Sequence, residues 1–389
     1  MIRALLVDLD DTLLENDVSR FLPAYLGLLT KDLSAFGPPD RVVGAVQRGT
    51  EAMLANADPA VTLLEAFFRG FTEVSGGPTA PVAEAIRRFY AESYPSLSRL
   101  TRPMVGAGDL LKEAAGRGMT IAVATNPLMT RHAVEQRLEW AGVPPSSFPY
   151  AVITTVEQFH FAKPRPAYYA EVLARLGCLP TEAVMIGNDP GEDLGPAASL
   201  GARGFLVGPT QHPEWPSGDL LQARTWLQAL ADHPGEADSR PAALVARLEG
   251  QLAGLLGVIQ GVDPAGLSRI AAPGALSPLE VICHLRDVDR EVNLPRLERI
   301  LLEDDPFLSA VDTDKWIVER GYLGEDPAAA VAGLVETRKL VIARLRDLNE
   351  TEWSRTARHA LLGPITLAGW IAVVTEHDLR HVGHVRVAD

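Results

Sequence analysis

Short apolar runs recur through the first half of the chain, and segments of helical periodicity lie between them. The runs lie at 2–8, 120–124, 151–154, 183–186 and 204–207. Uninterrupted apolar runs are typical of strands that are buried on both faces of a parallel sheet. Amphipathic helices are predicted at 107–117, 129–141 and 166–176. This alternation predicts an α/β doubly wound parallel sheet, in which ligands bind at the carboxyl ends of the strands.

The segment at about 15–100 interrupts this alternation. It contains several amphipathic helical stretches and no convincing strand. We therefore expect a helical cap inserted after the first strand. A cap that closes over the strand ends would exclude water, which strengthens charge interactions inside a site.

The second half of the chain is predicted to be entirely helical. Residues 232–241 are rich in Pro, Gly, Asp, Glu and Ser, a composition typical of a linker. Four long helices are expected at 242–260, 278–302, 327–348 and 367–387. Ser277, Pro278 and Glu280 provide a good start for the second of them. Four long helices favour an antiparallel four-helix bundle.

Length and composition fit two domains, at 1–231 and 242–389. A chain of 389 residues exceeds what one hydrophobic core usually organises. The formal net charge of −14 disfavours nucleic acid and anionic membrane surfaces as partners. Cys178 and Cys283 offer no disulfide framework, and no signal peptide or membrane-spanning run is expected. A cytoplasmic enzyme is the default expectation.

Candidate chemistry begins where the first apolar run ends, at Asp8-Leu9-Asp10-Asp11-Thr12. Asp8 and Asp10 are two residues apart, so both should point to the same side of the strand end. One carboxylate there can attack phosphorus while the other transfers the proton. An acidic turn that caps the next helix is the alternative interpretation.

Three further motifs follow later strands. Thr125 and Asn126 come after the second run, where a hydroxyl and a backbone N–H can hold a phosphoryl oxygen. Lys163 stands in a proline-rich loop and would place positive charge beside a phosphate. Asp189 and Asp193 follow another buried run, and their carboxylates suit Mg²⁺. Taken singly, these residues have alternative interpretations as a strand-end threonine, a solvated lysine and a helix cap.

Together the motifs resemble the four-motif pattern of the haloacid dehalogenase-like (HAD) hydrolases over about residues 1–210. The resemblance implies a Rossmann-like core and a phosphatase that works through an aspartyl-phosphate. It implies Asp8 as nucleophile, Asp10 as general acid and base, Thr125, Asn126 and Lys163 as phosphate-binding residues, and Asp8, the Asp10 carbonyl, Asp189 and Asp193 around Mg²⁺. The last motif is Gly-Asn-Asp where Gly-Asp is commoner, so which of Asp189 and Asp193 contacts the metal directly stays open.

Other members of that superfamily define alternatives. The dehalogenases lack the second aspartate, so Asp10 favours phosphate chemistry. Phosphonate-cleaving members need a cap lysine for an imine, and Lys31 is the only lysine in this cap; that interpretation needs an additional assumption. The helical insertion resembles the cap of the phosphoglycolate-phosphatase-like branch.

A second candidate site lies in the C-terminal half. His377 and His381 are four residues apart, so they share a helix face and can bind one metal ion together. His284, at a position expected to face the bundle core, is a candidate third ligand. The alternative is a hydrogen-bonded core histidine and a pair of cations favoured by the helix dipole.

This arrangement resembles the DinB-like superfamily of metal-binding four-helix bundles over about residues 242–387. The resemblance implies a divalent transition metal, zinc or nickel, on these three histidines. His359 and His384 are candidates for supporting or substrate-binding roles, and Cys283 is expected to be a buried spectator. Some members are transferases that use a low-molecular-weight thiol, so an enzyme and a metal-binding module are both open.

The expected function is therefore hydrolysis of a small phosphorylated metabolite. In the alternative, the C-terminal domain acts as a thiol transferase or metal-binding module and the hydrolase domain regulates it. Coupling of that kind would be reciprocal between the two sites. A homodimer is left open.

Overall fold

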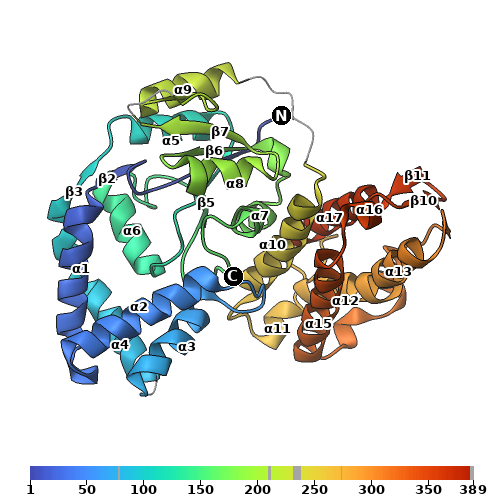
Figure 1. The fold of residues 1–389 in the computed structure, drawn as a ribbon, viewed down its shortest axis with the longest axis horizontal. Helices are drawn as coiled ribbons and strands as arrows, with labels where there is room; N and C mark the ends of the chain where they lie inside the picture. The colour runs from blue at the N-terminus through green and yellow to red at the C-terminus, as the bar shows by residue number, and fades with distance from the viewer. Residues whose placement is uncertain (78, 209–211, 231–237, 273, 386–389) are drawn as a thin grey trace. The chain divides into compact units, whose positions relative to one another are not determined.

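The structure is a computed structural model that describes residues 1–77, 79–208, 212–230, 238–272 and 274–385 (Figure 1). It divides into two compact units, Met1–Val172 with Pro180–Glu236, and Leu173–Leu179 with Ala237–Asp389. Of the linker expected at 232–241, residues 232–237 lie outside the described part of the chain. Helix α10 begins at the last residue of that range, Pro241.

The first unit is built on a six-stranded parallel sheet, as the alternating pattern predicts. The order β5-β4-β1-β6-β7-β8 places the first strand near the middle. Val7 at the end of β1 lies beside Val123 on one side and Ile186 on the other, so the carboxyl ends of three strands meet. The strands are β1 (Ala4–Val7), β4 (Thr120–Val123), β5 (Tyr150–Ile153), β6 (Ala183–Gly187), β7 (Arg203–Val207) and β8 (Ser217–Gly218).

Helices cover both faces of this sheet. α5 (Ala107–Gly116) and α9 (Leu220–Ala229) pack together on one face, and α7 (Pro166–Leu176) and α8 (Gly195–Ala198) lie on the other (Figure 1). α6 (Arg131–Trp140) adds Val134 and Leu138 to the same hydrophobic core as α5. All four residues of β1 are fully buried, which explains the uninterrupted apolar run at the start of the chain.

The cap is helical as predicted, but its base contains a short β-ribbon. β2 (Leu14–Asn16) pairs antiparallel with β3 (Thr101–Pro103) where the chain leaves and rejoins the core. The expectation of no strand in the segment is therefore wrong at its beginning. The cap helices are α1 (Val18–Asp32), α2 (Pro39–Ala55), α3 (Leu63–Ser75) and α4 (Thr79–Glu92), with 3-10 turns at Ser34–Phe36 and Tyr94–Leu100.

The second unit contains the four long helices of the predicted bundle. α10 (Pro241–Ile259) packs on α17 (Leu367–His384), and α12 (Pro278–Val288) packs on α15 (Pro327–Arg346). The second predicted helix is α12 and α13 (Leu294–Leu302) joined by a π-helical turn at Asp289–Asn293. Ser277 and Glu280 form the expected capping box at its start.

The prediction that this unit is entirely helical is wrong. β9 (Phe307–Leu308), β10 (Thr356–His359) and β11 (Gly363–Thr366) form a small sheet in the order β11-β10-β9. β9 has two residues, and β10 and β11 have four each, which is the shortest length at which an alternating pattern indicates a strand. Short helical segments occupy the connections: α11 (Pro264–Leu267), α14 (Lys315–Glu319), Tyr322–Gly324 and α16 (Glu350–Trp353).

Helix α10 is long and apolar enough to cross a membrane, so the expectation that no segment reaches that length is wrong. In the structure, however, 78% of its most apolar window is buried inside the protein. Leu244, Leu248 and Leu252 belong to the hydrophobic clusters of the bundle. Packing against the other bundle helices therefore accounts for the apolar sequence of α10.

Candidate functional site

The carboxylate of Asp8 lies at the end of the central strand and is almost fully buried. Its backbone N–H still donates to the carbonyl of Ile186 in β6, at 2.9 Å, so the sheet holds this residue in place. One carboxylate oxygen accepts from Nζ of Lys163 at 2.7 Å, and the other accepts from the hydroxyl of Thr12 at 3.0 Å. The first and third sequence motifs therefore meet in the structure.

Lys163 also donates to Asp193 at 2.5 Å, so one buried ammonium joins two carboxylates. Burial disfavours the charged form of Lys163, but the charges of Asp8 and Asp193 outweigh burial and raise its pKa well above the ordinary value. Burial, followed by the charge of Asp8, raises the pKa of Asp193 to about 6. The carboxylates of Asp8 and Asp193 thus share the single positive charge of Lys163. Their oxygen atoms are ligands that suit a hard metal ion such as Mg²⁺.

The acidic turn after β6 gives its two aspartates different surroundings. Asp189 is exposed and accepts from the backbone N–H groups of Gly191 and Glu192, at 2.7 and 2.9 Å, at the start of a π-helical turn. Asp193 is only 2% exposed and reaches back to Lys163. Asp193 is therefore the member of the pair that lies beside the Asp8 ion pair.

Thr125 and Asn126 follow β4 at the same edge of the sheet. The carbonyl oxygen of Thr125 accepts from the hydroxyls of Thr154 and Tyr168, both at 2.7 Å, which fixes the loop. Oδ1 of Asn126 is buried and has no hydrogen-bond partner within the described ranges. An unpaired buried polar atom costs free energy unless a ligand or solvent pairs with it, so this loop is suited to binding a polar group.

The carboxylate of Asp10 contacts a different set of residues from that of Asp8. Arg137 forms an ion pair with Asp10, and Nδ2 of Asn16 donates to it at 3.4 Å. The guanidinium of Arg137 lies 4.8 Å from the ring centroid of Phe21 in the cap and donates to the hydroxyl of Tyr94 at 3.2 Å. Asp10 is therefore held by α6 and faces the cap.

Arg137 is a functional candidate that the sequence did not reveal. It is 1% exposed, and burial lowers its pKa to about 10 while the charge of Asp8 opposes that shift. The side chain is therefore still charged at neutral pH. An arginine on an amphipathic helix is normally solvated, and the only sequence signal was its position between Val134 and Leu138 on the buried face.

In the second unit, the three predicted histidine ligands lie together. His284 comes from α12, and His377 and His381 come from α17. The Nε2 atoms of His284 and His377 are 3.3 Å apart, and the three ring centroids are 4.5 to 5.3 Å apart. Burial and then the neighbouring imidazoles lower the pKa of His284 to about 4 and that of His381 to about 3. Both rings are therefore neutral at pH 7, the form that binds metal ions.

Asp314 joins this cluster in the structure, and sequence analysis missed it. One ligand atom from each of the four residues lies within 4.8 Å of the others. Asp314 immediately precedes α14, in a connection without a periodic pattern that would mark it. Three imidazoles and a carboxylate are ligand types that zinc and related cations accept in four-coordinate sites.

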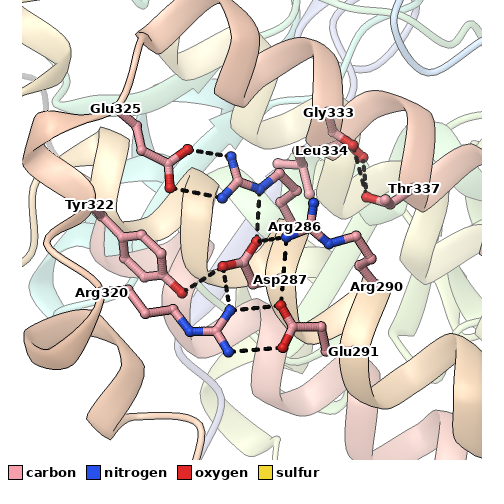
Figure 2. Close-up of polar contacts among 10 residues, drawn as sticks. All are labelled: Arg286, Asp287, Arg290, Glu291, Arg320, Tyr322, Glu325, Gly333, Leu334 and Thr337. Atoms are coloured by element: carbon pink, nitrogen blue, oxygen red, sulfur yellow. Dashed lines mark hydrogen bonds and ion pairs between the residues drawn. The ribbon is translucent and has the colours of Figure 1, made fainter.

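A network of ion pairs surrounds the buried carboxylate of Asp287 on α12 (Figure 2). Asp287 accepts from Arg286 at 2.8 Å, from Arg320 at 2.7 Å and from the hydroxyl of Tyr322 at 3.1 Å. The guanidinium of Arg320 also lies 3.8 Å from the ring centroid of Trp316. Two further ion pairs are bidentate, Arg286 with Glu325 and Arg320 with Glu291.

This network connects the two segments that supply His284 and Asp314. Asp287 lies three residues beyond His284 on α12, and Arg320 and Tyr322 lie in the same connection as Asp314. Bidentate charge-assisted bonds restrict geometry strongly. The network therefore fastens the connection that contains Asp314 to helix α12, which carries His284.

A second buried network supports His377. Its Nδ1 lies 3.2 Å from Asp378, and Asp378 pairs with Arg338 of α15 at 2.6 Å. Arg338 also pairs with Asp289 at 2.6 Å, and all three charged side chains are buried. Partners of this kind orient metal-binding imidazoles.

We predict that Arg338→Leu destabilises the second unit by about 3–5 kcal/mol, because it leaves two buried carboxylates without their cation. Urea unfolding of the full chain measures the loss. Arg344→Leu on the same helix is the matched control: Arg344 pairs with Glu298 and both side chains are more than a third exposed, so its loss should stay within about 1 kcal/mol. Equal losses in the two variants would contradict the assigned role of Arg338.

The remaining candidates lie outside the two clusters or outside the described residues. Nδ1 of His359 accepts from the backbone N–H groups of Leu361 and Leu362 at 3.3 Å, and its ring stacks on Trp370. Cys283 is buried, and burial raises the pKa of its thiol to about 12. The side chain of His384 is outside the described part of the chain, and Lys31 is exposed in the last turn of α1.

Comparisons with protein families agree with both resemblances. The family described as haloacid dehalogenase-like hydrolase matches residues 2–201, and the DinB superfamily matches residues 247–385. The chain belongs to the haloacid dehalogenase-like hydrolase family and carries a DinB-like domain after the hydrolase domain.

Individual relatives cover parts of the chain. It is 29% identical to phosphoserine phosphatase from Thermus thermophilus over 171 residues, which are 43% of this chain and 62% of that protein. A HAD phosphatase structure from Thermococcus onnurineus is 18% identical and covers 58% of this chain and 97% of its own, with a TM-score of 0.37. YfiT from Bacillus subtilis, described as having an unusual four-helix bundle topology, is 21% identical. The match covers 40% of this chain and 89% of YfiT, with a TM-score of 0.35. The chain spans less than two thirds of the length of the curated relatives that it matches.

Proposed function

We propose that the first unit hydrolyses a small phosphomonoester through an aspartyl-phosphate on Asp8, with Mg²⁺ as cofactor. The ion-paired cluster of Asp8, Lys163 and Asp193 at the end of the central strand carries this proposal. A carboxylate that is ion-paired with a buried ammonium is positioned to act as a nucleophile. The phosphoserine phosphatase relative supports phosphate esters as the substrate class.

In the proposed reaction, a carboxylate oxygen of Asp8 attacks phosphorus and the ester P–O bond breaks. Asp10 protonates the departing alkoxide and then takes a proton from the water that attacks the phosphoryl group. This second attack releases inorganic phosphate and restores the Asp8 carboxylate. Thr125, Asn126 and Lys163 would hold the phosphoryl oxygens.

The metal would be held by Asp8, Asp189, Asp193 and the backbone carbonyl of Asp10. When bound, Mg²⁺ would offset the negative charge of the phosphoryl oxygens. Two observations support this assignment: the candidate ligands are oxygen atoms, and the carboxylates of Asp8 and Asp193 lie close enough to share the ammonium of Lys163. We expect EDTA to abolish phosphate release from p-nitrophenyl phosphate and Mg²⁺ to restore it. A full rate in EDTA would exclude the metal from the proposal.

The close packing of Gly187 against Asp193 gives an independent prediction. A Cβ atom at Gly187 would overlap the side chain of Asp193, so Gly187→Ala must shift the carboxylate whose other oxygen binds Lys163. We expect kcat to fall about 100-fold, the scale of loss that small misplacements cause. Gly108→Ala is the control, because its nearest neighbour would be 3.9 Å away. An unchanged kcat in Gly187→Ala would show that the position of Asp193 is not needed.

We also propose that the second unit binds one divalent transition metal, with zinc or nickel as candidates, on His284, His377, His381 and Asp314. The convergence of the four ligand atoms supports this assignment. A carboxylate at the fourth position favours a closed metal-binding module over an open site for a thiol substrate.

A further inference from the structure

A cavity of about 420 Å³ lies between the cap and the core of the first unit. All four cap helices contribute to its wall, and the loop after β4 closes the core side. Most of the side chains that line it are apolar or aromatic, among them Phe21, Phe67, Met53, Ile86 and Val156. The volume is in the range of sites that bind small molecules.

Asp10 stands in the wall of this cavity. In the proposed reaction, Asp10 protonates the oxygen of the departing alcohol, so that oxygen must lie next to Asp10. The organic part of the substrate is attached to the same oxygen. It must therefore extend from Asp10 into the space that the cavity provides.

The charged groups of the cavity wall already have partners. Arg137 is paired with Asp10, and Arg87 is paired with Glu84 with 70% of its side chain exposed. Glu157 accepts from the backbone N–H of Arg131 at 3.0 Å. Of the two cations in the described wall, Arg87 is mostly exposed, and Arg137 is already ion-paired with Asp10, although Nε of Arg137 has no hydrogen-bond partner there. A carboxylate on the substrate would therefore have to share its buried counter-charge with Asp10, which is unfavourable.

The tyrosines of the wall add to its apolar character. The hydroxyls of Tyr25 and Tyr90 hydrogen-bond to each other at 2.9 Å. Because these polar ends are satisfied, the rings present carbon surface to the cavity. Aromatic walls of this kind favour ring-containing or branched aliphatic groups.

We infer that the substrate is a phosphate monoester of an apolar alcohol, whose aromatic or branched aliphatic group occupies the cap cavity. This inference rests on the proposed function of Asp8 and Asp10. It separates this chain from phosphatases whose substrate carries its own carboxylate, because Arg137, the buried cation of the described wall, is already ion-paired with Asp10.

The test compares three esters of primary alcohols, so that their leaving groups are similar: 2-phenylethyl phosphate, ethyl phosphate and O-phosphoserine. With the full chain and Mg²⁺, we expect kcat/KM for 2-phenylethyl phosphate to exceed each of the other two by about tenfold or more. Equal or faster turnover of O-phosphoserine would overturn the inference and leave the proposed function intact. If no ester is hydrolysed in a manner that requires Asp8, the proposed function fails and this inference fails with it.

A cavity-filling variant gives a second, structural test. Ala83 of α4 lines the cavity, whereas Ala91 of the same helix is exposed and does not. Ala83→Phe should raise KM for 2-phenylethyl phosphate about tenfold or more, and Ala91→Phe should not change it. Equal KM values in the two variants would overturn the assignment of the cavity. The ranking of the three esters in the unsubstituted chain decides the matter if Ala83→Phe does not fold.

Discussion

Replacement of Asp8 by asparagine is expected to lower kcat for p-nitrophenyl phosphate by about 10⁴-fold or more, the scale of loss of a catalytic nucleophile. The amide keeps the shape of the side chain but cannot form the acyl phosphate. In the unsubstituted chain, acid quenching during turnover should trap one phosphoryl group on Asp8, detectable by mass spectrometry. Neither turnover nor the trapped group should be seen with Asp8→Asn.

The fold should survive this substitution. Asp8 contributes to the raised pKa of Asp193, so removal of its charge relieves a repulsion while Lys163 keeps Asp193 as its partner. We expect an unchanged or higher Tm, which separates lost chemistry from unfolding. Asp17→Asn is the control, because asparagine also serves as an N-cap at that exposed position. Retained activity in Asp8→Asn would sink the assignment of Asp8 as nucleophile.

The sheet and the nucleophile cluster could be predicted because parallel strands impose strong constraints on sequence. A strand buried on both faces must be apolar throughout, and its first polar residue marks the carboxyl end. Asp8, Thr125 and Asp189 each follow such a run, and β4, β1 and β6 are neighbours in the sheet. Lys163 lies in a loop, so no periodic pattern predicts its position. Its place in the site could be predicted only from the resemblance to the family.

Arg137 and Asp314 could not be predicted for the opposite reason. Asp314 lies in a connection without a periodic pattern, and Arg137 is a charged residue on the buried face of α6, which an apolar pattern does not predict. Each reaches its site through contacts between distant segments: Arg137 with Asp10, and Asp314 with histidines of α12 and α17. The cavity depends on how four cap helices pack, which helical periodicity alone does not determine. The short strands β9 to β11 depend likewise on tertiary context, because strand preference reflects packing against neighbouring strands.

The second large effect is expected at the bundle histidines. His284→Ala and His377→Ala should each reduce the metal bound to the purified full chain from about one ion per chain to less than about a tenth of an ion. A four-coordinate site that loses an imidazole loses most of its free energy of metal binding. Plasma mass spectrometry measures the content and identifies the metal. Loss of the metal should leave the hydrolysis of p-nitrophenyl phosphate intact, since its residues lie in the first unit.

Graded variants test whether Asp314 is the fourth ligand. Asp314→Asn keeps the three imidazoles and should weaken zinc binding by about 10- to 100-fold, the scale at which removal of a supporting or weaker ligand acts. Asp312→Asn is the matched control, because Asp312 lies in the same connection, is exposed and pairs with Lys315 at 3.0 Å. His132→Ala, at an exposed position in the first unit, controls for the loss of a histidine. Equal zinc affinities for Asp314→Asn and Asp312→Asn would remove Asp314 from the site, whereas full metal content in His284→Ala would remove the site itself. An intermediate affinity for Asp314→Asn, together with a near-complete loss for His284→Ala, defines a closed site. In such a site the three imidazoles supply most of the affinity for the metal. The carboxylate of Asp314 then occupies the position that an open catalytic site would leave to solvent.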